Sequence, residues 1–286
     1  MTARPTVLSI QSSVAYGHVG NSAAVFPMQR LGVEVWPVHT VHFSNHTGYG
    51  EWRGPLLAAD EVAQVLTGIE ERGVLGDADA VLSGYQGAAD MGEVILQAVR
   101  RVKELNPRAV YCCDPVMGDV GRGMFVLPGI PELIRERVVC EADILTPNHF
   151  ELDFLAGRET RTLADVLDAV DTVRERGPRT VLVTSVLTDE TAPETLTMVA
   201  VDDAGAWLVT TPLLPITPNG CGDLTSALFL AHLLLGRATA TALGNVAGTV
   251  FGILELTLAA GTREIQLVAG QDLIAVPPVV QVTQLS

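Results

Sequence analysis

Residues 219–226 read Asn-Gly-Cys-Gly-Asp-Leu-Thr-Ser and lead directly into a long apolar stretch. Two glycines separated by one residue let the backbone turn so that successive N–H groups point inward, and the free N–H groups of a following helix point the same way. The segment therefore predicts an anion-binding turn with an acid, Asp223, at the start of a helix. An acid at that position also stabilises a helix without any catalytic role, so the turn alone leaves both interpretations open.

Short apolar runs rich in β-branched residues alternate with stretches of helical periodicity before this turn, and apolar helices follow it. This alternation predicts an α/β fold with a mainly parallel central sheet and helices on both faces. The turn at 202–205 predicts a hairpin, and hence an antiparallel edge. Strands are expected at residues 6–11, 33–39, 80–83, 109–114, 144–146, 180–184, 195–201 and 206–210. Helices are expected at residues 21–31, 60–72, 90–105, 130–137, 163–176, 223–235 and 238–259.

The bulk composition favours one folded unit over residues 1–286. Of these residues 48% are hydrophobic and 18% charged, and no Ser-, Gly- or Pro-rich linker, charge block or internal repeat interrupts the chain. The net charge of −15 argues against a nucleic-acid binder, because phosphate contacts require clustered lysine and arginine. An anionic ligand would instead need helix N-termini, backbone N–H groups and a divalent cation.

The expected location is the cytoplasm, without a membrane partner. The first five residues lead into a strand with no apolar signal segment, and the richest apolar run, residues 228–235, is too short to cross a bilayer. The four cysteines include no Cys-x-x-Cys pair, which favours reduced thiols. Adjacent Cys112 and Cys113 would point to opposite faces of their strand.

Three familiar kinds of active site do not fit the residues present. The single lysine, Lys103, lies in a helical pattern whose charges would face water, which disfavours a Gly-Lys-Ser/Thr nucleotide loop and a Schiff-base lysine. His39, His42 and His46 have no cysteine or acid beside them at zinc-ligand spacing. The chain also lacks the Gly-x-Ser-x-Gly elbow of serine hydrolases.

Polar segments follow several of the expected strands. Residues 9–21 form a Ser- and Gly-rich loop in which Asn21 would cap a helix, and residues 43–49 form a second polar loop with Trp52 close behind. Asp114 ends one strand and residues 146–151 end the next. Since carboxyl ends of parallel strands meet at one edge of a sheet, these acids would suit a cation that bridges phosphates. Capping and solvated loops remain the alternative for each segment taken alone.

Taken in order, the polar and glycine-rich segments of this chain resemble those of pyridoxal kinases in the ribokinase-like superfamily. The superfamily is indicated by Gly220-x-Gly-Asp223, and the pyridoxal branch by Tyr16-Gly-His-Val-Gly-Asn-Ser22 and Phe43-Ser-Asn-His-Thr-Gly-Tyr49. Further matching segments are Gln11-Ser12, Ser83-Gly-Tyr85, Cys113-Asp-Pro-Val116 and Thr146-Pro-Asn-x-x-Glu151. The resemblance covers nearly the whole chain.

The resemblance implies ATP-dependent phosphorylation of the 5′-hydroxymethyl group of pyridoxal, or of pyridoxine and pyridoxamine. Asp223 matches the catalytic base, and the N–H groups of Gly220, Cys221 and Gly222 would hold the charge of the transferred group. The matching substrate-binding residues are Ser12, Phe43, His46, Thr47, Gly48, Trp52, Tyr85 and Asp223. The matching nucleotide-binding residues are Asp114, Thr146, Asn148, Glu151, Thr184, Thr211, Pro212, Leu213 and Leu214. Asp114 and Glu151 would also serve Mg²⁺; a K⁺ requirement stays open, and a homodimer is implied.

Two departures and three alternatives accompany this resemblance. Some bacterial relatives carry a lysine where Val183-Thr-Ser185 stands, and the Thr-Ser version looks more like that of animal pyridoxal kinases. Cys221 replaces a residue that is commonly threonine or valine, and a thiol at a helix N-terminus can be acidified or can simply pack. The alternatives are a hydroxymethylpyrimidine kinase, a non-catalytic carrier of B6 vitamers, and a sugar kinase, which would want polar ring contacts instead of Phe43, Tyr85 and Trp52.

Overall fold

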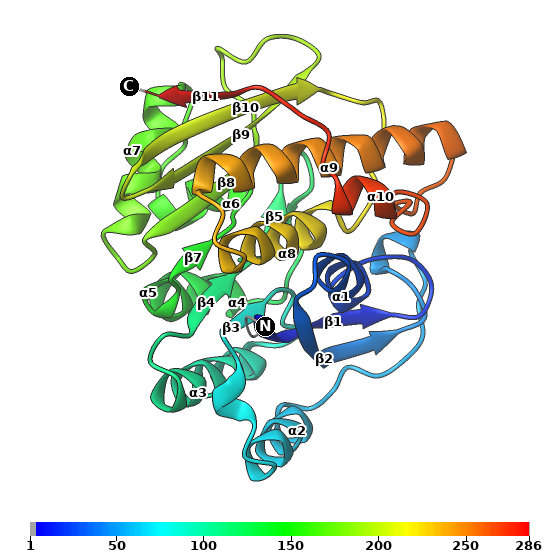
Figure 1. Cartoon of the computed structure of the whole chain (residues 1–286), viewed down its shortest axis with the longest axis vertical. Coiled ribbons are helices and arrows are strands. Elements are labelled where there is room, and N and C mark those ends of the chain that lie inside the picture. Colours follow the sequence, from blue (N-terminus) through cyan, green and yellow to red (C-terminus); the bar gives the residue numbers. More distant parts are fainter. Residues whose placement is uncertain (1–3, 286) are drawn as a thin grey trace.

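The computed structural model describes residues 4–285, which build one nine-stranded sheet with helices on both faces (Figure 1). The strand order is β11-β10-β9-β8-β7-β4-β3-β1-β2, and neighbours from β2 to β8 run parallel whereas β8 to β11 pair antiparallel. The strands are β1 (Thr6–Val14), β2 (Glu34–Phe43), β3 (Ala80–Ser83), β4 (Val110–Cys113), β7 (Ile144–Leu145), β8 (Thr180–Val186), β9 (Thr195–Asp202), β10 (Gly205–Pro212) and β11 (Val282–Leu285). The predicted mainly parallel sheet with an antiparallel edge is therefore confirmed.

The helices connect these strands, and a short hairpin stands apart from the sheet. The long helices are α1 (Asn21–Arg30), α2 (Ala59–Glu71), α3 (Ala89–Leu105), α6 (His149–Ala156), α7 (Leu163–Arg174), α8 (Cys221–Leu234) and α9 (Thr239–Ala260). The short ones are α4 (Ile130–Leu133), the π-turn η3 (Ile134–Val138), α5 (Val139–Glu141), α10 (Gln271–Ala275) and the 3₁₀ turns η1 (Thr47–Tyr49) and η2 (Leu75–Asp77). The hairpin consists of β5 (Gly118–Asp119) and β6 (Gly123–Met124).

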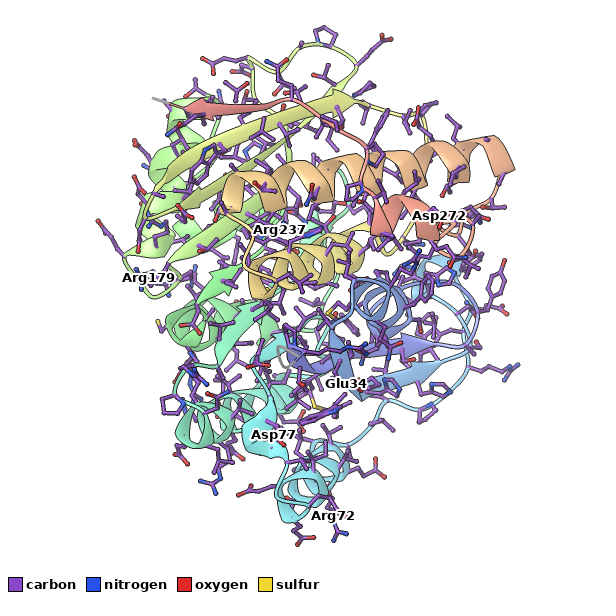
Figure 2. All side chains as sticks on the ribbon, in the orientation of Figure 1. Glu34, Arg72, Asp77, Arg179, Arg237 and Asp272 are labelled. Carbon is purple, nitrogen blue, oxygen red and sulfur yellow. The ribbon has the colours of Figure 1, made fainter. Side chains whose placement is uncertain are left out.

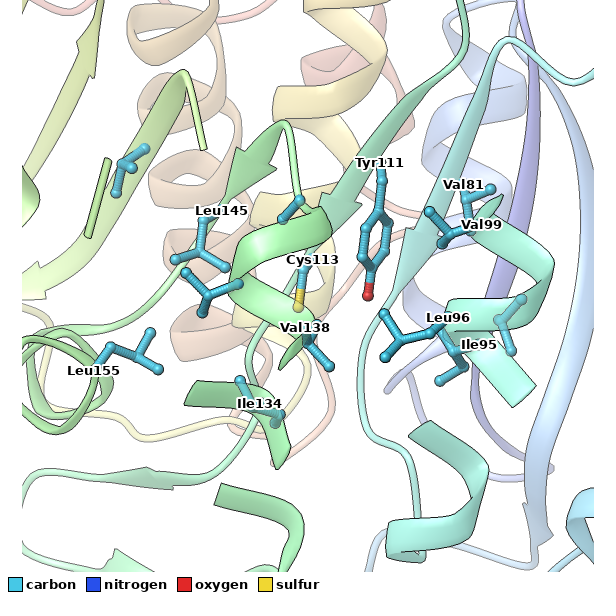
Figure 3. Packing of buried hydrophobic residues seen from close by; sticks show 14 of the residues in the cluster. Val81, Ile95, Leu96, Val99, Tyr111, Cys113, Ile134, Val138, Leu145 and Leu155 are labelled. Carbon is cyan, nitrogen blue, oxygen red and sulfur yellow. The ribbon is translucent and has the colours of Figure 1, made fainter. Parts of the chain in front are cut away.

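Each face of the sheet has its own apolar core. Residues of β4 alternate between them: Cys112 packs with α1, α8 and α9, whereas Cys113 packs with α3 and α7 on the opposite face. This confirms the predicted opposite orientation of the two thiols, and it follows from the two-residue period of a strand. Figure 3 shows Tyr111 and Cys113 between Val138 and the side chains of α3. Two buried faces explain why the strands read as continuous apolar runs.

The structure differs from the local predictions at several elements. The polar residues 146–151 were expected only to end a strand, but α6 begins within them at His149, with Asn148 as its N-cap. The hairpin β5–β6, α10 and β11 were not predicted. Asn21 does not cap α1, because Gly20 is the N-cap and the buried Asn21 side chain donates to the Val38 carbonyl instead (3.0 Å). The expectation that residues 1–3 carry no signal segment lies outside the described residues.

Most charged side chains lie at the periphery of the molecule, and its most apolar long helix is partly buried. Arg72 at the end of α2 and Arg179 before β8 lie at the periphery of the molecule (Figure 2). Among the described helices, α9 is long and apolar enough to cross a membrane, although 56% of its most apolar stretch is buried in the fold. That burial is what the core helix of a globular domain shows as well.

His232, in the buried part of α8, makes the fold sensitive to acid. Neither ring nitrogen has a hydrogen-bond partner within residues 4–285, and desolvation followed by the charge of Arg237 lowers its pKa from 6.5 to about 4. The unfolded chain therefore takes up the proton first, and the stability contribution present above pH 6.5 is lost as pH falls toward 4. We expect His232→Leu to show a smaller fall in Tm between pH 7 and pH 5 than the unchanged protein. The exposed His42→Leu should show the unchanged fall; equal slopes in all three proteins would contradict the prediction.

Candidate active site

The carboxyl ends of β1, β3, β4, β7 and β8 open onto a cavity of about 450 Å³ that the N-terminus of α8 and one side of α9 complete. This is the edge at which open α/β sheets collect their ligands. The cavity wall contains every predicted site residue except Gly48 and Trp52. The sequence prediction thus selected residues that the fold brings together, while their individual roles stay predictions.

Asp223 lies where the cavity is lined by free helix N–H groups. Gly220 is the N-cap of α8 with φ 87°, so Asp223 is the third helical residue and precedes the first N–H that is paired within the helix, that of Leu224. The backbone N–H groups of Gly20 and of Asp223 itself favour the charged form of the carboxylate and lower its pKa. Desolvation nevertheless raises its pKa, because burial disfavours the charged form of an acid. A carboxylate made more basic in this way is better suited to accept a proton.

Gly220 is fixed by crowding as well as by its backbone conformation. A Cβ at this position would lie 1.8 Å from the carbonyl oxygen of His18, which no side chain can tolerate. The loop after β1 therefore packs directly on the turn before α8. The predicted glycine turn depends on this long-range contact in addition to its own φ.

Asp114 is buried at the end of β4 and is tied to α8. The Ser226 hydroxyl lies 3.0 Å from Asp114 Oδ2 and 2.8 Å from the Thr146 hydroxyl. Desolvation first, and then the negative charges of Glu151 and Asp223, hold the pKa of Asp114 well above its ordinary range. Asp114, Glu151 and Asp223 thus line the cavity close enough for their charges to affect one another, and none of the three forms an ion pair within residues 4–285.

Glu151 has a structural role besides the predicted one, because it caps α6 and holds the neighbouring hairpin. It completes a capping box on α6, because its Oε2 accepts from Asn148 N (2.9 Å) while Asn148 Oδ1 accepts from Glu151 N (2.9 Å). Its Oε1 accepts from the N–H of Met117 (2.9 Å). Burial raises its pKa to about 8 despite these bonds. The carboxylate fixes the start of the β5–β6 hairpin against α6.

The acids fit a hard cation better than a transition metal. No group of three or more His, Cys, Asp or Glu side chains gathers closely enough for a metal anywhere in residues 4–285. Mg²⁺ needs only one or two protein carboxylates, because it keeps waters and binds substrate phosphates. Asp114 lies beside other negative charges, and among the described residues only its Oδ2 accepts a hydrogen bond, from Ser226. Its Oδ1 could therefore bind the cation, whereas both Glu151 oxygens already accept from main-chain N–H groups.

One end of the cavity is suited to a flat, partly apolar ring. Ser12 and Thr47 line it together with Phe43, His46 and Tyr85. Burial raises the pKa of the Tyr85 phenol, which therefore stays neutral. Trp52 lies outside the wall: its side chain is 46% exposed, and its ring centroid is 6.1 Å from that of Phe43. Trp52 therefore supports Phe43 from behind.

The other end of the cavity is more apolar and contains the predicted residues Thr211, Pro212, Leu213 and Leu214. Thr184 and Ser185 face it from an irregularity in β8, where Ser185 takes φ 53°. Three groups of wall residues were not predicted. They are Leu196 and Met198 of β9; Ala247, Val250, Phe251 and Leu254 of α9; and Asp119, Arg122 and Phe125 of the β5–β6 region.

Cys221 is not an acidified thiol. Burial, and then the charge of Asp223, raise its pKa to about 12. The local charge and desolvation therefore outweigh the helix N-terminus, which would favour the thiolate. Of the two roles left open by the sequence, packing is the one that the structure supports.

Known proteins similar to this chain are kinases over nearly its full length. The family model described as phosphomethylpyrimidine kinase matches residues 75–265. Pyridoxal kinase PdxY of Rubrobacter xylanophilus is 63% identical over 274 residues, which cover 96% of this chain and 94% of that protein. Pyridoxal kinase PdxY of Leifsonia xyli subsp. xyli is 58% identical, with 95% and 96% coverage.

Solved structures extend the similarity to three dimensions. Pyridoxal kinase from Leishmania donovani, in complex with ADP and pyridoxine, matches with a TM-score of 0.92 at 30% sequence identity, covering 98% of this chain and 99% of that one. Identity, coverage and fold therefore agree with one another. The chain belongs to the pyridoxal kinases, a branch with the ribokinase-like fold within the wider family that the phosphomethylpyrimidine kinase model describes.

Proposed function

We propose that this protein, as a single kinase domain, transfers the γ-phosphoryl group of ATP to the 5′-hydroxymethyl oxygen of pyridoxal. The observation that carries the proposal is the place of Asp223, whose carboxylate lies beside the free N–H groups of α8 in one continuous cavity. The ring-sized end with Ser12 and Tyr85 would hold the vitamer, and the apolar end at residues 211–214 would hold the nucleotide. Asp223 lies in the same cavity wall as the residues of both ends.

The transfer couples loss of a proton from the acceptor to formation of its bond to phosphorus. Asp223 takes the proton of the hydroxymethyl group as that oxygen forms a bond to the γ-phosphorus, while the bond from phosphorus to the bridging oxygen of ADP breaks. The N–H groups of Gly220, Cys221 and Gly222, with the N-terminus of α8, would stabilise the charge on the transferred group. Mg²⁺ at Asp114 would neutralise phosphate charge that a protein at −15 otherwise repels.

A coupled assay of ATP consumption with pyridoxal, pyridoxine, pyridoxamine and hydroxymethylpyrimidine tests this function. The matching family model favours the pyrimidine as the second candidate acceptor. We expect the highest kcat/KM with a B6 vitamer. Higher kcat/KM with the pyrimidine would replace the proposed substrate, and binding of vitamers without transfer would indicate a carrier. Omission of Mg²⁺ should abolish turnover, and comparison of Na⁺ with K⁺ buffers tests the monovalent ion.

Tyr85 and Trp52 should differ in their effect on the acceptor. We expect Tyr85→Ala to raise the KM for pyridoxal up to about tenfold, because an aromatic contact contributes roughly 0.5–1.5 kcal/mol and Tyr85 lines the cavity. Trp52→Ala should change this KM less, since Trp52 lies outside the cavity wall and its ring packs on Phe43. Steady-state kinetics with pyridoxal as the varied substrate measures both; a larger effect at Trp52 would place the ring elsewhere.

We also propose a cytoplasmic homodimer. Both expectations rest on the family resemblance. Light scattering on the purified protein measures the mass in solution, and a monomeric mass of 30.3 kDa would overturn the dimer.

A further inference from the structure

Glu264 lies outside the cavity wall, yet it contacts two of the loops that form it. The residue follows α9 and is buried, with 8% of its surface exposed. Its Oε2 accepts a hydrogen bond from the N–H of His18 (3.0 Å), in the loop after β1. Its Oε1 accepts from the hydroxyl of Tyr49 (2.6 Å), in the loop after β2. One carboxylate therefore joins loops that are far apart in sequence.

The surrounding backbone is shaped to admit this carboxylate. Gly17 takes φ 92°, and a Cβ there would lie 2.1 Å from Glu264 Oε2. The backbone of Glu264 also forms an isolated parallel bridge with Asn219, directly before the glycine turn. Next to it, the Arg263 guanidinium lies 4.5 Å from the centre of the Tyr49 ring. The segment after α9 thus contacts three segments beside the cavity: the loop after β1, the loop after β2 and the residue before the glycine turn.

The contact with His18 leads to the proposed base in two steps along the chain. The backbone N–H of Gly20, two residues after His18, favours the charged form of the Asp223 carboxylate, and the His18 carbonyl packs against Gly220. The contact with Tyr49 leads to the other side of the site, because Thr47 lines the cavity two residues earlier. A displacement of Glu264 would release both sides together.

We propose that Glu264 is a positioning residue that holds the acceptor-binding loops and Asp223 in their working geometry. The inference rests on the proposed kinase function and deepens it. No group on Glu264 touches substrate; it acts through His18 and Tyr49. Since the nucleotide end is built from β8, β10 and α9, the effect of losing Glu264 should fall on the acceptor and not on ATP.

Glu264→Ala tests the inference through the two Michaelis constants. We expect the KM for pyridoxal to rise and kcat to fall, with kcat/KM for pyridoxal down about 10- to 100-fold, as expected for two hydrogen bonds to a charged group. The KM for ATP should stay within about twofold. Glu264→Gln, which can still accept from His18 and donate to Tyr49, should recover most of the loss. The exposed Glu255→Ala on α9 is the matched control and should leave every constant unchanged.

Tyr49→Phe removes one of the two contacts and provides the coupling test. Its effect on kcat/KM for pyridoxal should be smaller than that of Glu264→Ala, and the double variant should be no worse than Glu264→Ala alone. The phenol offers a second readout, because the hydrogen bond to Glu264 raises the pKa of Tyr49 to about 12. Tyrosine-labelled NMR should show that pKa falling toward 10 in Glu264→Gln.

The outcomes separate this inference from the kinase function itself. An unchanged protein that fails to phosphorylate any vitamer would refute the function, whatever Glu264 does. An active protein whose Glu264→Ala variant loses Tm but keeps both Michaelis constants would refute the positioning role. Equal rises in both constants would refute it as well. If Glu264→Ala does not fold, Glu264→Gln and Tyr49→Phe decide, since both nearly preserve the shape of the residue they replace.

Discussion

Asp223→Asn should reduce kcat with pyridoxal by about three orders of magnitude while changing its KM only a few-fold, because a general base contributes roughly 10²–10⁴ in rate. The amide has the same shape, and its oxygen can still accept from the Gly20 N–H that favours the charged carboxylate. It cannot take the proton of the hydroxymethyl group. Steady-state kinetics at saturating ATP measures the loss.

Two further measurements make that result specific to proton transfer. Asp168→Asn, on the exposed side of α7, removes an acid without touching the cavity and should retain full turnover. The affinity of Asp223→Asn for pyridoxal, measured by calorimetry, should stay near that of the unchanged protein. If turnover survived the substitution, another group would have to accept the proton, and the assignment of Asp223 would be wrong.

Gly220→Ala should lower kcat by about two orders of magnitude, comparable with the loss of one pre-positioned donor of an anion hole. The added Cβ would overlap the His18 carbonyl at 1.8 Å, and φ 87° disfavours any L side chain. Relief of the overlap must move the turn, the loop that carries Gly20, or both. The N–H groups of residues 220–222 would then no longer converge on the transferred phosphate. A lower Tm should accompany the kinetic loss.

Gly236→Ala separates the two causes. Gly236 follows α8 at its other end with φ 78°, and a Cβ there would meet nothing within 4 Å. This variant carries the backbone cost of about 1 kcal/mol that a left-handed alanine incurs, but no steric overlap. We expect it to lose Tm and keep kcat. Loss of kcat in both variants would show that helix stability, and not the turn, limits turnover.

The fold was predictable as far as local patterns determine it. Strands and helices of the parallel half followed from periodicity, and the hairpin β9–β10 from its turn residues 202–205. The α6 helix was not predicted, because the residues at its start, around Asn148, are polar and serve as a cap. The last strand, β11, lacks an apolar run; it exists because β10 offers a free edge with which residues 282–285 pair. Tertiary context, absent from any local window, decided the case of β11, whereas the capping box of Asn148 and Glu151 is a local signal for the start of α6.

The site was predictable where short segments carry their own chemistry. The glycine turn before Asp223 and the acids that end the strands were identifiable, because strand ends converge in this class of fold. Residues that reach the site from a distance were not. Arg122 depends on the folding of a hairpin outside the sheet, and Phe251 on which side of α9 faces the cavity. Glu264 lies between two loops more than 200 residues away from it in sequence.

The pairing of β11 with β10 bears on how the protein can be handled. Four residues, 282–285, cover the outer edge of the sheet from Ala206 to Val209 (Figure 1). Without them, β10 would expose a row of unpaired main-chain groups, the kind of template on which chains stack into aggregates. Expression tags therefore belong at the opposite terminus, and a truncation before residue 282 would leave the edge of β10 unpaired and favour aggregation.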